Sequence, residues 1–211
     1  MTIAADVLLG LAVFAALIDW WGVARGRLSV EFIARPVVII ALVGTALAID
    51  TDVDVTRGLV IAALGASLVG DVVMMAPDAR YEAGLMAFLV GHVLYIAALA
   101  DSVQGGLVLV VALLAFGIGI GAAPQIIEGG RREHPVIGGL VALYVVSVGV
   151  MATMAAGTGV LVAAIGGALF VASDWLLLWN RYVGPAPGGR MLVHVTEHLA
   201  QIGLVLWLAA G

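Results

Sequence analysis

Two aspartates lie inside long apolar stretches of this sequence. Asp71 follows Gly70, Asp174 follows Ser173, and large apolar residues follow each aspartate. An ionised carboxylate inside a membrane-spanning segment is costly unless it is paired, protonated or facing water. Low dielectric favours the protonated carboxyl, and a second carboxylate nearby favours it further. The pattern therefore predicts a general acid and its partner anion. Each aspartate alone also fits a structural hydrogen bond or an arginine partner.

His92 and Tyr95 are three residues apart, so they share one face of a helix. A histidine in an apolar segment needs a polar partner. We expect Asp71, on the preceding segment, to be that partner. The plainer interpretation is a buried histidine bonded to a hydroxyl or a carbonyl.

A polar stripe runs along the last apolar segment. His194, Glu197, His198 and Gln201 recur at the spacing of one helix face. The string from His194 to His198 also matches H-x-x-E-H, an inverted zinc-hydrolase motif. Positions 199–211 contain no further acidic residue or histidine, so a third zinc ligand would have to come from another segment.

Composition defines the elements that must position these residues. The chain has 211 residues, of which 64% are hydrophobic and 11% charged, whereas a soluble domain has about 25% charged residues. We predict an all-α, polytopic membrane protein of the cell membrane, forming one helical domain over residues 1–211. The net charge of -5 and the absence of cysteine exclude a basic nucleic-acid surface, disulfides and thiolate metal sites. We expect no cofactor.

About eight segments are long enough to span the roughly 30 Å hydrocarbon core. All nine basic residues are arginines, and eight of them follow odd-numbered segments. This bias places both termini on the non-cytoplasmic side. Asp19 is expected near the interface, where water solvates it. Trp20 is expected in the aromatic belt at the same interface. The predicted spans are 3–22, 34–50, 57–76, 83–101, 106–123, 135–156, 159–179 and 191–210.

The depths of the polar residues agree. Asp71, Asp174 and Glu197 each lie about one and a half turns from the cytoplasmic end of their segments, and His92 lies near the midplane. A polar pocket in the cytoplasmic half is therefore expected. Arg35, before Pro36, is expected to open the second segment there. It either binds a lipid phosphate or extends its charge to the interface.

Several of these stretches together resemble the YhhN family of eight-helix membrane proteins, bacterial relatives of eukaryotic lysoplasmalogenases. The resemblance covers the second to the eighth segment in order. The chain departs from the family pattern in two places: Arg35 stands where a lysine is common, and Glu197 with His198 stand where tyrosines are common. The matching stretches are residues 67–74 with G-D, 88–95 with G-H-x-x-Y, 167–174 with S-D, Asn180-Arg181 and Leu199-Ala200-Gln201.

The resemblance implies hydrolysis of the vinyl ether of a lysoplasmalogen to a fatty aldehyde and a glycerophospho-base. Asp71 and Asp174 would then be acid and counter-charge, in either order, with His92 relaying a proton to water. Arg35 would hold the phosphate of the lysophospholipid. The remaining substrate contacts would come from Tyr95, Ser173, Glu197, His198 and Gln201.

Two other functions remain open from the sequence. A zinc hydrolase acting on a lipid amide or ester would use His194, Glu197 and His198. A transporter or lipid-binding protein would need broken helices near the midplane, and no paired prolines occur within the segments.

Overall fold

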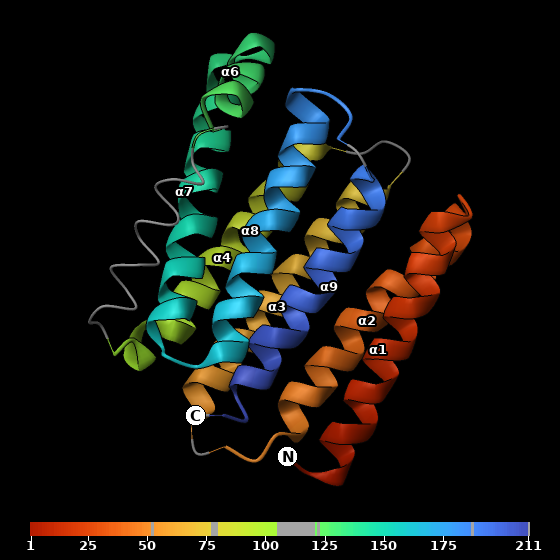
Figure 1. Ribbon diagram of the computed structural model, residues 1–211, viewed down its shortest axis with the longest axis vertical. Helices are drawn as coiled ribbons and strands as arrows, with labels where there is room; N and C mark the ends of the chain where they lie inside the picture. Colours follow the sequence, from red (N-terminus) through yellow and green to blue (C-terminus); the bar gives the residue numbers. More distant parts are fainter. Residues whose placement is uncertain (52, 77–79, 105–120, 122, 187, 211) are drawn as a thin grey trace.

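The computed structural model describes residues 1–210 apart from 52, 77–79, 105–120, 122 and 187. Every regular element in these residues is helical, which confirms the all-α class. The helices stand roughly side by side in one bundle (Figure 1). They are α1 (Ile3–Ala24), α2 (Leu28–Ala48), α3 (Asp54–Met75), α4 (Tyr81–Leu99), the 3-10 turn η1 (Ala100–Ser102), α6 (Ala123–Glu133), α7 (Pro135–Gly157), α8 (Leu161–Tyr182) and α9 (Gly189–Trp207).

Six of the described helices are long and apolar enough to cross a membrane: α1, α2, α3, α4 with η1, α7 and α8. The eighth predicted span corresponds to α9, whose polar stripe makes it less apolar. The predicted span 106–123 lies almost wholly outside the described residues. Both termini lie at the same end of the bundle (Figure 1). The side of the membrane that they face stays a prediction.

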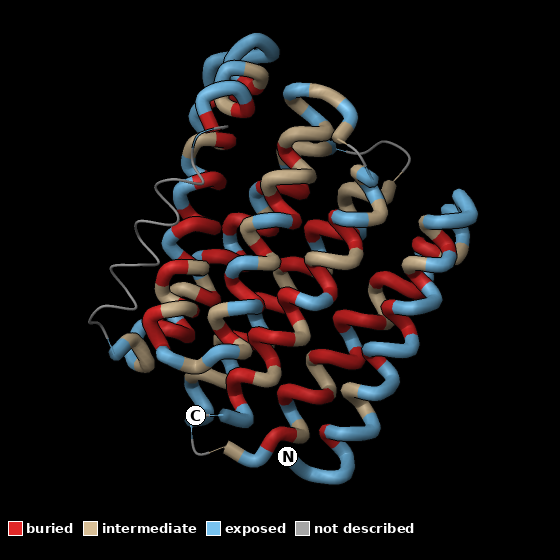
Figure 2. Tube along the Cα trace, in the orientation of Figure 1, coloured by how far each residue is buried: buried red, intermediate tan, exposed pale blue. Residues whose placement is uncertain are grey.

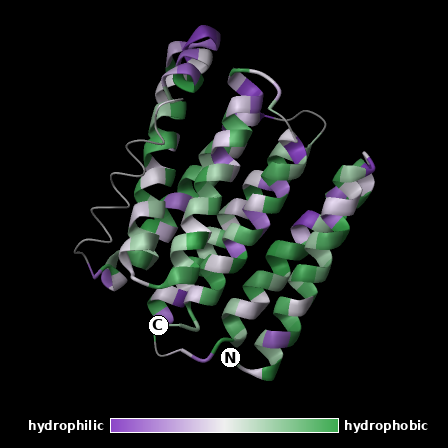
Figure 3. Ribbon diagram, viewed as in Figure 1, coloured by the Kyte–Doolittle hydropathy of each residue, from purple (hydrophilic) through white to green (hydrophobic). Residues whose placement is uncertain are grey.

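The outer faces of the helices are apolar, as a lipid-facing surface requires. Phe14, Leu47, Val55 and Leu161 are each more than half exposed. Buried residues line the inner faces of the helices (Figure 2). Hydrophilic residues occur at helix ends and at a few interior positions (Figure 3). Those interior positions require partners, because the hydrocarbon offers none.

Two boundaries differ from the prediction. The helix α2 begins at Leu28 instead of residue 34, so Arg35 and Pro36 lie about two turns inside it. Proline removes only one backbone donor, and the surrounding apolar residues favour continuing the remaining hydrogen bonds. Glu31 and Arg35 had interrupted the apolar pattern, yet both side chains are buried within the bundle.

The second difference is α6, which falls in a stretch predicted to be a connection. Its buried residues are Ala123, Ile126 and Gly130, on one face, and it ends with Arg131 and Arg132. Such a short helix with one apolar face packs against α7 without spanning the membrane.

Small residues allow α8 and α9 to approach closely. A Cβ atom added to Gly203 of α9 would lie 3.0 Å from the Cα of Gly166 and 3.0 Å from the carbonyl oxygen of Val162, both on α8. On the other side of the core, a Cβ at Gly70 of α3 would lie 2.8 Å from the ring of Phe88 on α4. These contacts hold the helices that bear Asp174, Asp71, His92 and the α9 stripe.

Candidate active site

Arg35 is the centre of a buried network that connects three helices. Its Nη2 lies 2.7 Å from Oδ1 of Asp71 on α3 and also pairs with Oε2 of Glu197 on α9. The three side chains are at most about 10% exposed. One guanidinium therefore bridges two carboxylates, and we call these three residues, with Asp19 and His194, the arginine network.

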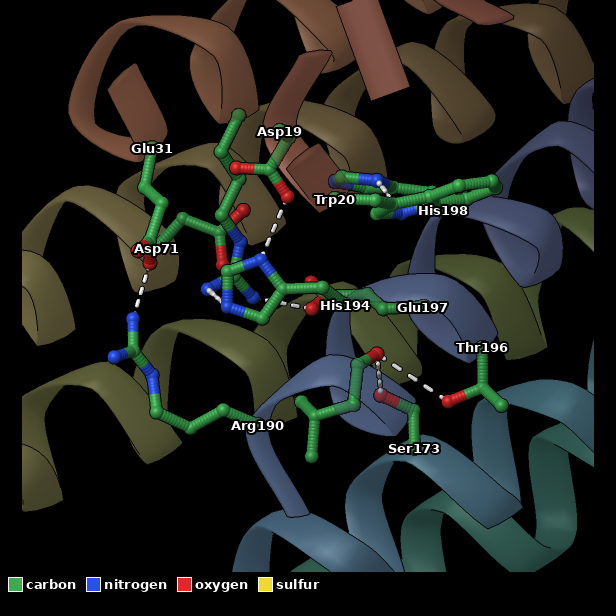
Figure 4. A network of polar contacts seen from close by, with 12 residues as sticks. Asp19, Trp20, Glu31, Asp71, Ser173, Arg190, His194, Thr196, Glu197 and His198 are labelled. Atoms are coloured by element: carbon green, nitrogen blue, oxygen red, sulfur yellow. Dashed lines mark hydrogen bonds and ion pairs between the residues drawn. The ribbon is translucent and has the colours of Figure 1, made fainter. Parts of the chain in front are cut away.

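Asp19 of α1 completes this network, contrary to the expectation that it is solvated. Its side chain is fully buried, and its Oδ2 lies 2.7 Å from Nδ1 of His194 (Figure 4). The other ring nitrogen of His194 lies 3.5 Å from Nη1 of Arg35. Arginine only donates, so Nε2 of His194 accepts and Nδ1–H donates to Asp19. The prediction failed because α1 continues to Ala24 and packs its inner face against α9.

Trp20 also turns inward, which corrects its placement in the aromatic belt. Its indole N–H donates to Nδ1 of His198 over 3.1 Å, and the two rings stack (Figure 4). Because Nδ1 accepts, a neutral His198 carries its proton on Nε2. That nitrogen is buried and has no partner among the described residues.

The second carboxylate, Asp174, belongs to a different pair. Its Oδ2 lies 3.0 Å from Nε2 of His92 on α4. The prediction that Asp71 is the partner of His92 is therefore wrong, because Asp71 is taken by Arg35. Being on the preceding segment in sequence did not make Asp71 the residue that faces His92. The two aspartates thus have different basic partners.

Ser147 of α7, which the sequence did not single out, fixes the protonation of His92. Its hydroxyl donates to the carbonyl of Tyr144 over 2.8 Å and lies 3.1 Å from Nδ1 of His92. A hydroxyl has one proton, so Nδ1–H of His92 donates to Ser147. Nε2 is then the ring nitrogen that faces Oδ2 of Asp174.

Aromatic rings enclose the His92–Asp174 pair. Tyr144 and Phe170 meet the imidazole edge-on, with centroids 4.9 and 5.6 Å from it, and Tyr95 meets Phe170 at 5.9 Å. The position of Tyr144, one turn before Ser147 on α7, brings it to the histidine. These rings keep the pair in a low-dielectric environment.

Several predicted substrate-binding residues are buried with polar atoms that have no hydrogen-bond partner in the described part of the chain. Buried polar atoms are normally satisfied, so this set indicates a place for a polar ligand or water. Ser173 differs, because its hydroxyl donates to the carbonyl of Val193 and joins α8 to α9. The unpartnered atoms are the Tyr95 hydroxyl, both amide atoms of Gln201, Oε1 of Glu197 and Nε2 of His198.

Most ring nitrogens of the H-x-x-E-H histidines already have partners among the described residues. Both ring nitrogens of His194 are engaged, with Asp19 and Arg35, and Nδ1 of His198 accepts from Trp20. Zinc needs free lone pairs on converging ligands. In the described residues, no three histidine, aspartate or glutamate side chains converge to hold an ion.

Two cavities lead toward the arginine network from the end of the bundle opposite the termini. One, of about 300 Å³, lies between α2, α3 and α9, and the other, of about 290 Å³, lies between α4, α8 and α9. Arg190 and His194 line both cavities. His194 also contacts Arg35, so this side chain connects both cavities to the arginine network.

Comparison with known proteins gives one match of high coverage. Residues 30–208 of the chain match the model of the YhhN family. No curated protein and no solved structure matches the chain. The matched range contains every residue of the site except Asp19 and Trp20.

Proposed function

The chain belongs to the YhhN family, and from this we propose that it is an integral membrane hydrolase that cleaves the vinyl ether bond of a lysoplasmalogen. The reaction adds water and releases a fatty aldehyde and a glycerophospho-base. The observation that carries the proposal is the combination of a buried His92–Asp174 pair with a carboxylate-rich network in one helical bundle. We place the protein in the cell membrane.

The slow step of vinyl ether hydrolysis is protonation of a carbon, which gives an oxocarbenium ion. This step needs an acid that has a proton to give. The His92–Asp174 pair can meet that need by sharing one proton, because Nε2 and Oδ2 lie 3.0 Å apart. In this assignment Asp174 and His92 act together as the general acid.

The cation that forms needs a nearby anion, as in glycoside hydrolysis. The arginine network supplies it, since Asp71 and Glu197 pair with one guanidinium and a third carboxylate, Asp19, joins through His194. Even with one of these carboxyls protonated, the network retains negative charge. Asp71 and Glu197 are therefore the counter-charge, and Arg35 holds them in place.

Water then attacks the oxocarbenium carbon and loses a proton. The His92–Asp174 pair has just given up its proton, so it can accept one from the attacking water. The resulting hemiacetal collapses to the aldehyde and the alcohol of the glycerophospho-base. Tyr95, Gln201 and His198 have free polar atoms to orient the substrate oxygen and the water.

Aldehyde release from lysoplasmenyl lipid tests this function. We expect Asp174→Asn and Asp71→Asn to lower kcat by about 10²-fold or more, the usual contribution of a positioned acid. Asp6→Asn serves as the control, because Asp6 is an exposed aspartate on α1. Folded Asp71 and Asp174 variants that keep wild-type rates would contradict the mechanism. A wild-type protein that binds the lipid without releasing aldehyde would contradict the activity and indicate a lipid-binding protein.

A further inference from the structure

The first turn of α9 separates the two cavities that lead to the arginine network. Leu28, Phe32, Met74 and Met75 line the first cavity, together with Glu31. Tyr81, Leu177, Asn180, Arg181 and Val193 line the second. Arg190, in the first turn of α9, lines both cavities.

Arg190 and Arg35 differ in their capacity to bind an anion. The Arg35 side chain is 10% exposed and already bridges two carboxylates. The Arg190 side chain is 58% exposed and pairs through one nitrogen with a single carboxylate, that of Glu31 (Figure 4). Its other guanidinium N–H groups have no acceptor within the described residues, and this planar fork suits a phosphate.

We propose that Arg190 binds the phosphate of the lipid headgroup at the entrance to the arginine network. This assignment rests on the proposed function for the identity of the lipid, and it moves the phosphate contact from Arg35 to Arg190. Arg181 also lines the second cavity, but both of its terminal nitrogens pair with the Glu133 carboxylate, which leaves Arg190 as the arginine of this wall with the freer guanidinium in the described residues. The positive end of the α9 dipole lies at the same place, since none of the described side chains caps its first turn.

The order of the groups along the cavity matches the order of the groups in a lysophospholipid. His194 lines both cavities beside Arg190, and its Nε2 contacts Arg35, which binds Asp71. A phosphate at Arg190 therefore places the glycerol beside His194 and the ether oxygen near the carboxylates. The headgroup base stays toward water, where the Arg190 side chain is exposed.

Direct binding tests the site without requiring the reaction. The ligands are an acyl lysophosphatidylethanolamine, which has no vinyl ether, a monoacylglycerol with the same chain, and inorganic phosphate. Dissociation constants are measured with the full-length protein in neutral detergent by native mass spectrometry. The variants are Arg190→Gln, Glu31→Gln and, as the matched control, Arg25→Gln, because Arg25 is an exposed arginine at the same end of the bundle.

We expect Arg190→Gln to weaken lysophospholipid binding about tenfold, since a hydrogen bond to a charged group typically contributes this much, and to leave monoacylglycerol binding unchanged. Glu31→Gln should tighten lysophospholipid binding, because it removes the carboxylate that competes for Arg190. Arg25→Gln should change neither.

Three results would overturn the assignment. Lysophospholipid could bind Arg190→Gln as tightly as wild type. Arg190→Gln and Glu31→Gln could weaken binding equally, which would make the ion pair purely structural. Inorganic phosphate could bind as tightly as the lysophospholipid, with the same dependence on Arg190, which would make this a site for free phosphate. Each readout is independent of aldehyde release, so failure of the proposed reaction is distinguished from failure of this site.

Discussion

At the scale of single residues, the hydrogen bonds of Ser147 determine which nitrogen of His92 carries a proton. Ser147 gives its one proton to a carbonyl, so it can only accept from His92. This leaves Nε2 as the ring nitrogen of His92 that faces Asp174 and that would exchange a proton with it in the proposed reaction. Ser147 is thus a positioning residue, which acts on the chemistry through His92.

Ser147→Ala tests this role. The substitution leaves the Nδ1–H of His92 without an acceptor, at a cost of about 1–3 kcal/mol. We expect kcat to fall about tenfold with KM unchanged, and the pH profile of kcat to shift, because the balance of protonation between His92 and Asp174 changes. The measurement is steady-state aldehyde release across pH, with Ser147→Thr expected to restore the wild-type profile.

Thr153→Ala is the matched control for this prediction. Thr153 lies on the same helix, is buried, and its hydroxyl has no partner among the described residues. If both alanine variants lower kcat equally with an unshifted pH profile, Ser147 contributes only packing.

The sequence predicted most of the residues in the site but few of their pairings. Apolar surroundings identify Asp71, Asp174 and His92 as buried polar groups that need partners. Periodicity places residues on one face of a helix but does not tell which other helix packs against that face. For this reason the sequence did not predict that His92 pairs with Asp174, more than eighty positions away. Asp19 was missed because its distance from a helix end was estimated without the packing of α1 against α9.

At the scale of elements, the contact between α8 and α9 determines how Asp174 lies relative to the α9 stripe. The backbones approach closely where Gly166 faces Gly203. Ser173 adds a hydrogen bond to the carbonyl of Val193 further along the same contact. The length of each apolar segment was enough to predict that a helix is present. The start of α2 was not predictable, because the charged residues Glu31 and Arg35, which are buried, made its first two turns resemble a connection.

Gly203→Ala should separate α8 from α9. Its Cβ would meet backbone atoms of α8 at 3.0 Å, and backbone cannot rotate away as a side chain can. We expect destabilisation of about 1–3 kcal/mol, the usual cost of overpacking, together with reduced aldehyde release. Thermal unfolding in detergent measures the first effect. Gly65→Ala is the control, since a Cβ there meets nothing within 4 Å, and equal melting temperatures for the two variants would contradict the prediction.

At the scale of the whole molecule, arginine placement and the shared end of the termini define the expected orientation. The turn between α1 and α2 and the connection between α8 and α9 lie at the end opposite the termini (Figure 1). Arg25, Arg27, Arg181 and Arg190 lie at this end. The positive-inside rule then predicts that the mouth of both cavities faces the cytoplasm.

Cysteine labelling in intact cells tests this orientation. The chain has no native cysteine, so only an introduced cysteine of this protein can react. Ala209→Cys, at an exposed position near the last helix end, should react with an impermeant maleimide added outside. Arg27→Cys, exposed in the turn between α1 and α2, should react only after lysis. The reverse pattern would place the cavities on the outer side.

The arginine network also constrains the order in which the molecule can be made. Arg35 emerges from the ribosome early in α2, and its partner Asp71 follows in α3, but Glu197 arrives only with α9. His194 is also synthesised only with α9, so Asp19 on α1 has no histidine partner before then. The final helix, less apolar than the six candidate spans, thus brings Glu197 to an arginine that is already inserted. Translation of α9 is the step at which Arg35 gains its second carboxylate and Asp19 gains its histidine.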